Sequence, residues 1–357
     1  MTAAVYFTFP DRGFRYECRG CGACCKGHGI GLDVAGGQLV QLAARRPEIV
    51  PFLRRRGEAV TAFNPRDRCW FLEDDGLCRV EVEDGRAAKP ASCRLFPFNR
   101  VFRLGDVVVV DFNSVICPLQ LAPAGDGVPH ADVLAELATI TDPAIVGTPL
   151  PGDGAAFLAQ EQPIAAALFA ADATLDSAWA AQAGAAGLAD ARADVDALFA
   201  ATGAGAWAPP ADLAAARLLT PSLRFNELYG PRAYAPRAAM GPVLARMWLA
   251  WLGFCGLGER LARRPLGLQE MTTVWSEQAP LLHVAARWRD VPVRAPGAIE
   301  LPSADPAGAV RALAQAAIDN RKARRPLSAL VAAMPADPIV RVTALKLADG
   351  ILRTAFS

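Results

Sequence analysis

Apolar residues follow two different patterns along the chain, and the change falls near residue 121. Upstream, turn residues interrupt short apolar runs, which predicts short strands and helices in an irregular arrangement. Downstream, long Ala- and Leu-rich segments end at Pro or Gly, and this pattern predicts helices of ordinary length. The sequence therefore predicts an α+β fold, with a small irregular domain over residues 1–122 and a mainly α-helical domain over residues 130–357.

Individual elements can be placed on this pattern. Residues 39–43 predict a helix that Asp33 caps and Pro47 closes. Residues 100–112 predict a short β-hairpin with its turn at Gly105-Asp106, and its four-valine second strand is expected to be covered on both faces. In the second domain, helices are expected over residues 131–140, 153–170, 172–201, 210–218, 236–264, 266–288, 306–319 and 336–355.

Charge and hydropathy exclude several classes of partner. The 37 basic and 36 acidic residues give a net charge of +1, so the field that attracts nucleic acid is absent and no nucleic-acid partner is expected. The longest apolar run, residues 247–258, is too short to span a membrane. The first ten residues show no export signal, which predicts a cytoplasmic protein whose thiols stay reduced.

Cysteines are concentrated in the first third of the chain, where eight of the nine lie. In a reducing compartment such crowding favours metal ligation over disulfides, and we expect ligation to replace a large apolar core there. The ninth, Cys255, has wholly apolar neighbours and is expected to pack in the helical core. The predicted metal ligands are Cys18, Cys21, Cys24, Cys25, Cys69, Cys78, Cys93 and Cys117.

The spacing of the first four cysteines carries the strongest signal. Cysteines two residues apart can wrap one ion in a tight turn, and the intervening glycines permit the necessary backbone angles. Eight thiolates can hold two four-ligand metal ions, or one iron–sulfur cluster and a zinc; the ferredoxin-like triple spacing favours iron–sulfur. Adjacent Cys24 and Cys25 are not expected to point at one tetrahedral ion. Basic residues close in sequence that can neutralise the thiolates are Arg19, Lys26, Arg79 and Arg94.

Histidine adds few candidates. His28 lies three residues after Cys25 and offers a Cys₃His alternative, although eight thiols already suffice. His130 and His283 have no cysteine nearby in sequence and are not expected to be ligands.

These motifs resemble the YkgJ-type cysteine cluster family, which is the CxxCxxCC zinc- or iron-chelating domain. The resemblance covers about residues 14–120 and rests on the cysteine motifs at 18–25, 69–78, 90–97 and 117–118. It implies that all eight upstream thiols are metal ligands. Lys89 stands where the family usually has arginine, a change expected to affect packing rather than ligation.

Two further functions stay open. The cysteine architecture is similar to that of flagellin lysine-N-methylases, which implies an AdoMet-dependent methylase with a protein substrate as an alternative. The residues give this no independent support, since no strand–GxGxxG–helix unit is present. A structural zinc module for protein–protein contact is the other alternative. No catalytic residue can be assigned, so whether the chain is an enzyme stays open.

Overall fold

The structure is a computed structural model, and two compact units divide the chain. The first comprises residues 1–169, 218–225 and 267–269, and the second comprises residues 170–217, 226–266 and 270–357. The residues that the structure describes are 4–16, 21–26, 30–32, 38–56, 59–62, 68–114, 116–117, 119–123, 125–139, 147–170, 187–193, 195–196, 199, 206–230 and 237–275.

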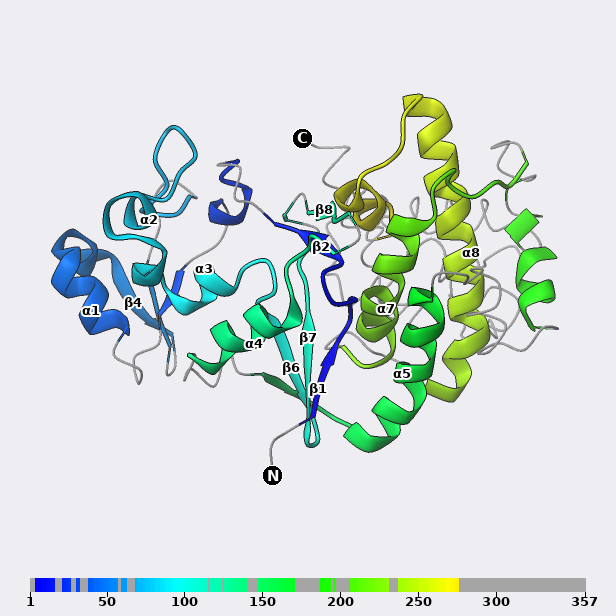
Figure 1. Ribbon diagram of the computed structural model, residues 1–357, viewed down its shortest axis with the longest axis horizontal. Coiled ribbons are helices and arrows are strands. Elements are labelled where there is room, and N and C mark those ends of the chain that lie inside the picture. The colour runs from blue at the N-terminus through cyan, green and yellow to red at the C-terminus, as the bar shows by residue number, and fades with distance from the viewer. Residues whose placement is uncertain are drawn as a thin grey trace, which may run out of the picture. The chain divides into compact units, whose positions relative to one another are not determined.

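Short strands and helices alternate in the first unit (Figure 1). In chain order they are β1 (Ala4–Phe7), β2 (Phe14–Arg15), the 3₁₀-helix η1 (Ala23–Cys25), β3 (Ile30–Leu32), α1 (Gln38–Arg45), η2 (Pro47–Phe52), β4 (Leu53–Arg56), β5 (Ala59–Ala62), α2 (Arg79–Asp84), η3 (Arg86–Ala88), α3 (Ala91–Leu95), β6 (Arg100–Leu104), β7 (Val107–Asp111), β8 (Gln120–Leu121), α4 (His130–Ala138), β9 (Thr148–Leu150) and α5 (Gly154–Phe169). Longer helices follow, namely α7 (Ala214–Leu228) and α8 (Arg237–Ala262). The predicted α+β class is confirmed.

A four-stranded mixed sheet, in the order β1-β7-β6-β9, organises the first unit. The predicted hairpin is confirmed as the antiparallel pair β6 and β7, in which Leu104 pairs with Val107 across the turn. Gly105 takes a φ of 60° there, a conformation that glycine adopts without steric cost. Val107, Val109 and Val110 are buried, so both faces of β7 are covered, as its apolar sequence predicts.

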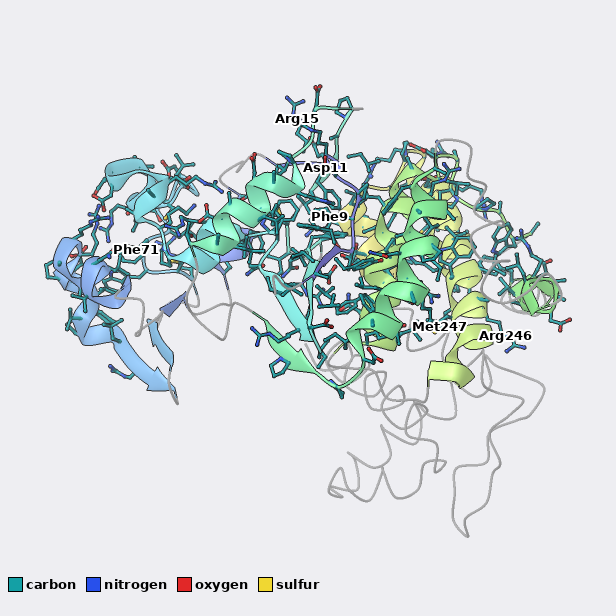
Figure 2. The ribbon with its side chains drawn as sticks, turned by 60° about the horizontal axis from the view of Figure 1, so that its bottom comes forward. Phe9, Asp11, Arg15, Phe71, Arg246 and Met247 are labelled. Carbon is teal, nitrogen blue, oxygen red and sulfur yellow. The ribbon has the colours of Figure 1, made fainter. Side chains whose placement is uncertain are left out.

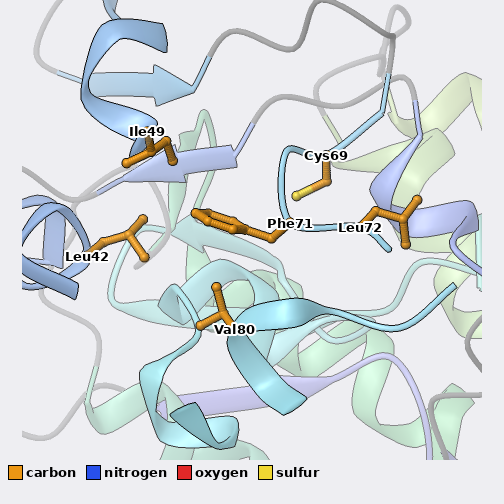
Figure 3. Packing of buried hydrophobic residues seen from close by; sticks show 6 residues of the cluster. All are labelled: Leu42, Ile49, Cys69, Phe71, Leu72 and Val80. Carbon is orange, nitrogen blue, oxygen red and sulfur yellow. The ribbon is translucent and has the colours of Figure 1, made fainter. Parts of the chain in front are cut away.

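The first unit has more apolar core than its sequence predicts. One cluster lies between α1, η2 and the segment that begins at Cys69, with Phe71 in its midst (Figure 3). A second cluster joins Phe9 and Phe14 to Phe98 and Phe112 through ring contacts. In Figure 2 Arg15 lies at the outer edge, away from Phe9, and both Asp11 and Arg15 are exposed. The expectation that metal replaces an apolar interior is therefore wrong for this part of the chain, because aromatic rings from distant segments meet.

Helix α1 contains the predicted helix over residues 39–43, and it ends at Arg45 just before Pro47. The predicted cap Asp33 lies outside the described residues. Next to α1, strands β3, β5 and β4 form a small antiparallel sheet in the order β3-β5-β4.

Helices make up most of the described part of the second unit. In α8, Trp248 and Trp251 are fully buried, and Trp251 donates its indole N–H to the Met271 carbonyl at 2.9 Å. Cys255 is buried in the same helix, as its apolar neighbours predict. Helices α4, α5, α7 and α8 overlap four segments predicted as helical, although α4 and α5 belong to the first unit. The predicted segments at 306–319 and 336–355 lie outside the described residues. The domain boundary placed between residues 122 and 130 stays a prediction.

Among the helices that the structure describes, none combines the length and apolar character needed to cross a membrane.

Candidate metal centre

The adjacent thiols of Cys24 and Cys25 lie in a tight turn. Gly22 precedes η1 with a φ of 65°, and its carbonyl accepts the backbone N–H of Cys25 at 2.9 Å. A Cβ atom at Gly22 would lie 3.1 Å from the Leu72 side chain, in a backbone conformation that other residues rarely adopt. The prediction that a glycine permits a tight turn here is confirmed for Gly22, which leads into η1 with Cys24 and Cys25.

The sulfurs of Cys24 and Cys25 lie 3.7 Å apart. Two thiolates on one tetrahedral zinc, with Zn–S bonds of about 2.3 Å, are separated by about 3.8 Å. The adjacent pair therefore has the spacing that a single tetrahedral ion requires. The expectation that these adjacent thiols do not point at one tetrahedral ion stays a prediction, since a separation alone does not assign them to one ion.

Cys69 is brought to the same place by backbone pairing. Its N–H donates to the Cys25 carbonyl, and a β-bridge joins the flanking residues Lys26 and Arg68. The Cys69 side chain is buried and belongs to the apolar cluster of Figure 3, against which Cys25 also packs. Two segments more than forty residues apart in sequence thus bring Cys25 and Cys69 to the same apolar cluster.

Cys78 and Cys93 begin or lie within short helices that border the same cluster. Cys78 is the N-cap residue of α2, and a β-bridge to Leu72 closes the intervening turn. Cys93 lies in α3, where its N–H donates to the Pro90 carbonyl at 2.9 Å. Both side chains are half-buried and pack against the cluster, as does Cys25.

Among the described residues, the structure does not bring the remaining predicted ligands to this cluster. Cys18 lies outside them, and Cys21 is exposed. Cys117 is buried beyond β7, where its N–H donates to the Asn113 carbonyl at 3.2 Å. None of the cysteines that the structure describes forms a disulfide, and within that part of the chain no three Cys, His, Asp or Glu side chains stand close enough to hold a metal ion.

Proximity makes these thiols hard to ionise. The hydrogen bond to Cys25, together with burial, raises the pKa of Cys24 far above its usual value. The hydrogen bond from Cys24 lowers the pKa of Cys25, but the hydrogen bond to Cys69, burial and the nearby charges of Cys69 and Cys93 outweigh it and raise that pKa to about 12. Both thiols are therefore protonated near neutral pH. A bound cation reverses this preference, so metal binding here must release protons.

Two of the basic residues predicted to neutralise the thiolates have carboxylate partners. Arg94 pairs with Glu136 of α4 at 2.6 Å, and Arg79 pairs with Glu48 and Glu73 at 3.6 and 3.4 Å. Lys26 is exposed, and Arg19 lies outside the described residues.

Lys89 is the residue that sequence reasoning missed. Its side chain is only 13% exposed, and its ammonium lies 2.5 Å from a Glu81 carboxylate oxygen. Burial lowers the pKa of Lys89, but Glu81, Cys78 and Cys93 outweigh this effect and raise that pKa. Lys89 begins a Lys-Pro-x-x-Cys motif, which links it in sequence to Cys93. The sequence alone does not show that its charge is buried.

His130 has a packing role in this structure. Its ring stacks on Phe7 with centroids 3.7 Å apart, and its Nε2 atom hydrogen-bonds the Phe9 carbonyl at 2.9 Å. His28 and His283 lie outside the described residues.

Reduced thiols from separate short elements, gathered beside one apolar cluster, define a cysteine-rich domain of the metal-chelating class. Residues 17–117 match the family model described as "CxxCxxCC: Putative zinc- or iron-chelating domain". The family resemblance seen in the cysteine motifs is thereby confirmed over this stretch. No curated protein and no solved structure matches the chain.

Proposed function

We propose that the first unit binds a zinc or iron ion through Cys24, Cys25, Cys69 and Cys93. The observation that carries this proposal is the 3.7 Å separation of the Cys24 and Cys25 sulfurs, which suits two thiolates on one tetrahedral ion. Cys69 belongs to the apolar cluster against which Cys25 and Cys93 pack, and both Cys69 and Cys93 raise the pKa of Cys25, so we assign them the other two positions. Thiolates suit both zinc and iron, in agreement with the matched family.

Binding requires the Cys69 and Cys93 sulfurs to move toward the pair. Structural zinc in small domains contributes about 10–16 kcal/mol, which exceeds the cost of changing two side-chain rotamers. The bound ion would supply a rigid link between η1, the turn at Cys69 and α3. Within the eight-cysteine pattern, Cys18, Cys21, Cys78 and Cys117 then remain as a second set.

The test is the metal content of the anaerobically purified protein, together with its visible spectrum. The proposal predicts bound zinc or iron, less of it in Cys25→Ser, and unchanged content in Cys255→Ala, because Cys255 is buried in α8 away from the other cysteines in sequence. A wild-type protein without metal, or a Cys25→Ser variant with full content, would contradict it. A brown protein containing acid-labile sulfide would instead identify an iron–sulfur cluster and overturn the single-ion assignment.

A further inference from the structure

The thiols of Cys24 and Cys25 form an adjacent dithiol at a partly open position. Their sulfurs lie 3.7 Å apart and are not joined by a disulfide. Both side chains are half-buried, so solvent reaches them, whereas Cys69 and Cys255 are buried. A small molecule that reacts with thiols therefore meets two reduced sulfurs side by side.

The backbone holds this pair in place before any ligand binds. The Cys25 N–H donates to the Gly22 carbonyl at 2.9 Å, and the Lys26 N–H donates to the Ala23 carbonyl at 3.3 Å. These two hydrogen bonds close η1, the turn that contains both cysteines. A ligand that bridges the sulfurs therefore costs the protein little conformational entropy.

Two neighbouring sulfurs suit a soft atom that forms two bonds to thiols. Trivalent arsenic with one organic group, R–As(OH)₂, is such an atom and has two positions to fill. At each position an As–S bond replaces an As–O bond, and the thiol proton leaves with the hydroxyl as water. Arsenic stays trivalent throughout. Because it is pyramidal, it holds both sulfurs on one side, which a short separation allows, whereas a linear two-coordinate ion needs them on opposite sides.

The surroundings of the pair suit the organic group on arsenic. Cys25 packs against the apolar cluster that contains Phe71 and Leu72 (Figure 3). The Leu72 side chain also lies next to Gly22, at the start of the turn. An apolar group gains free energy in such surroundings because burial removes it from water.

We propose that Cys24 and Cys25 form a binding site for a trivalent organoarsenical that bridges their two sulfurs. This inference goes beyond the proposed zinc or iron binding, because it needs two thiols, no third ligand and no movement of Cys69 or Cys93. It suits a chain whose described residues bring no three metal-binding side chains together.

Binding of phenylarsine oxide, which hydrates to this form, tests the inference on the full chain. A chelator first removes any metal ion, since a bound ion would occupy the same thiols. Mass spectrometry then measures the adduct in an excess of a monothiol. Arsenic held by two protein sulfurs resists the monothiol, because both bonds must break before it leaves, and a small vicinal dithiol removes it. Alkylation and peptide mapping of the wild type should show Cys24 and Cys25 protected together.

Cys24→Ser and Cys25→Ser are each expected to bind the arsenical about 100-fold more weakly, because only one bond to this turn remains. Cys21→Ser is the matched control, since Cys21 lies three residues before Cys24 and is exposed. It should keep the affinity of the wild type. Circular dichroism checks that each variant folds, and the mapping of the wild type needs no variant.

An adduct that maps to other cysteines in the wild type would overturn the inference. So would full affinity in Cys24→Ser or Cys25→Ser, or a loss in Cys21→Ser as large as theirs, which would mean that the arsenical takes the most accessible thiol. A purified chain without zinc or iron would refute the proposed function but not this inference, because the arsenical is added to metal-free protein. The two failures are therefore distinguishable.

Discussion

At the scale of single residues, the direction of the thiols depends on one glycine. Gly22 has the left-handed backbone conformation that starts η1, and the Leu72 side chain lies against it. Any side chain at this position costs backbone energy and also meets Leu72, and both effects turn Cys24 and Cys25 away from their present directions.

Gly22→Ala is therefore expected to lower the free energy of unfolding by about 1–2 kcal/mol and to weaken metal binding. Denaturant unfolding and chelator competition measure the two effects. Gly125→Ala is the matched control, because Gly125 also has a positive φ, of 90°, but has nothing within 4 Å of an added Cβ. It should lose similar stability and keep its metal affinity; equal affinity in both variants would contradict this role of Gly22.

The lowered pKa of His130 leads us to expect that the stability of the fold depends on pH. Burial lowers its pKa below the usual 6.5, and the hydrogen bond to the Phe9 carbonyl and the charge of Asp11 offset this only in part. The unfolded chain therefore binds a proton at higher pH than the folded chain does. The contribution of His130 is fully present above pH 6.5 and is lost as the pH falls through 6.5 toward its lower folded pKa.

Urea unfolding between pH 5 and pH 7.5 checks this expectation, with His130→Phe as the comparison because it keeps a ring against Phe7. The difference in stability between the wild type and the variant should shrink as the pH falls. A difference that is independent of pH would show that His130 does not titrate between the two states.

At the scale of elements, buried polar contacts join α5 and α7 to the main sheet. Glu161 of α5 and Arg224 of α7 form a two-point ion pair at 2.7 and 2.9 Å, with 3% and 4% of their side chains exposed. Asp111 at the end of β7 is fully buried and accepts hydrogen bonds from Thr8 and Ser222, each at 2.6 Å. Such contacts have one low-energy arrangement, so they specify how the helices dock within the first unit.

Glu161→Gln removes a charge from this pair and is expected to cost about 3–5 kcal/mol of unfolding free energy, because the Arg224 guanidinium stays buried. Replacing both residues, as Glu161→Leu with Arg224→Met, should recover most of that loss. Denaturant unfolding of the three proteins gives the comparison. A single variant as stable as the wild type would mean that the pair does not hold α5 against α7.

At the scale of the whole molecule, the features set by local sequence patterns were predicted better than those set by contacts between distant residues. The hairpin at 100–112 and the helix around Leu42 follow from periodicity and turn residues, which act within a few positions. The cysteine motifs likewise identified the metal-chelating family over residues 17–117.

The missed features depend on tertiary contacts. Spacing along the chain could not show that Lys89 is buried, or that a 3₁₀ turn sets the Cys24 and Cys25 sulfurs 3.7 Å apart. The ring cluster of Phe9 and Phe112 was missed for the same reason, since its members lie about a hundred residues apart in sequence.

Metal removal should affect the first unit unevenly. Chelation is expected to speed amide hydrogen exchange around η1 and α3, which the ion would link, and to change exchange little in β7, whose valines are buried without it. Exchange followed by mass spectrometry, with and without chelator, makes this comparison. Uniform loss of protection across η1, α3 and β7 would show that the sheet also depends on metal.

X-ray absorption at the zinc or iron edge tests the central claim most directly, because it counts the sulfur ligands of the bound ion. The account predicts a first shell of four sulfurs at about 2.3 Å, with one sulfur fewer in Cys24→Ser and also in Cys25→Ser. A shell dominated by oxygen or nitrogen, or an unchanged sulfur count in either variant, would contradict the assignment of both neighbouring cysteines to one ion.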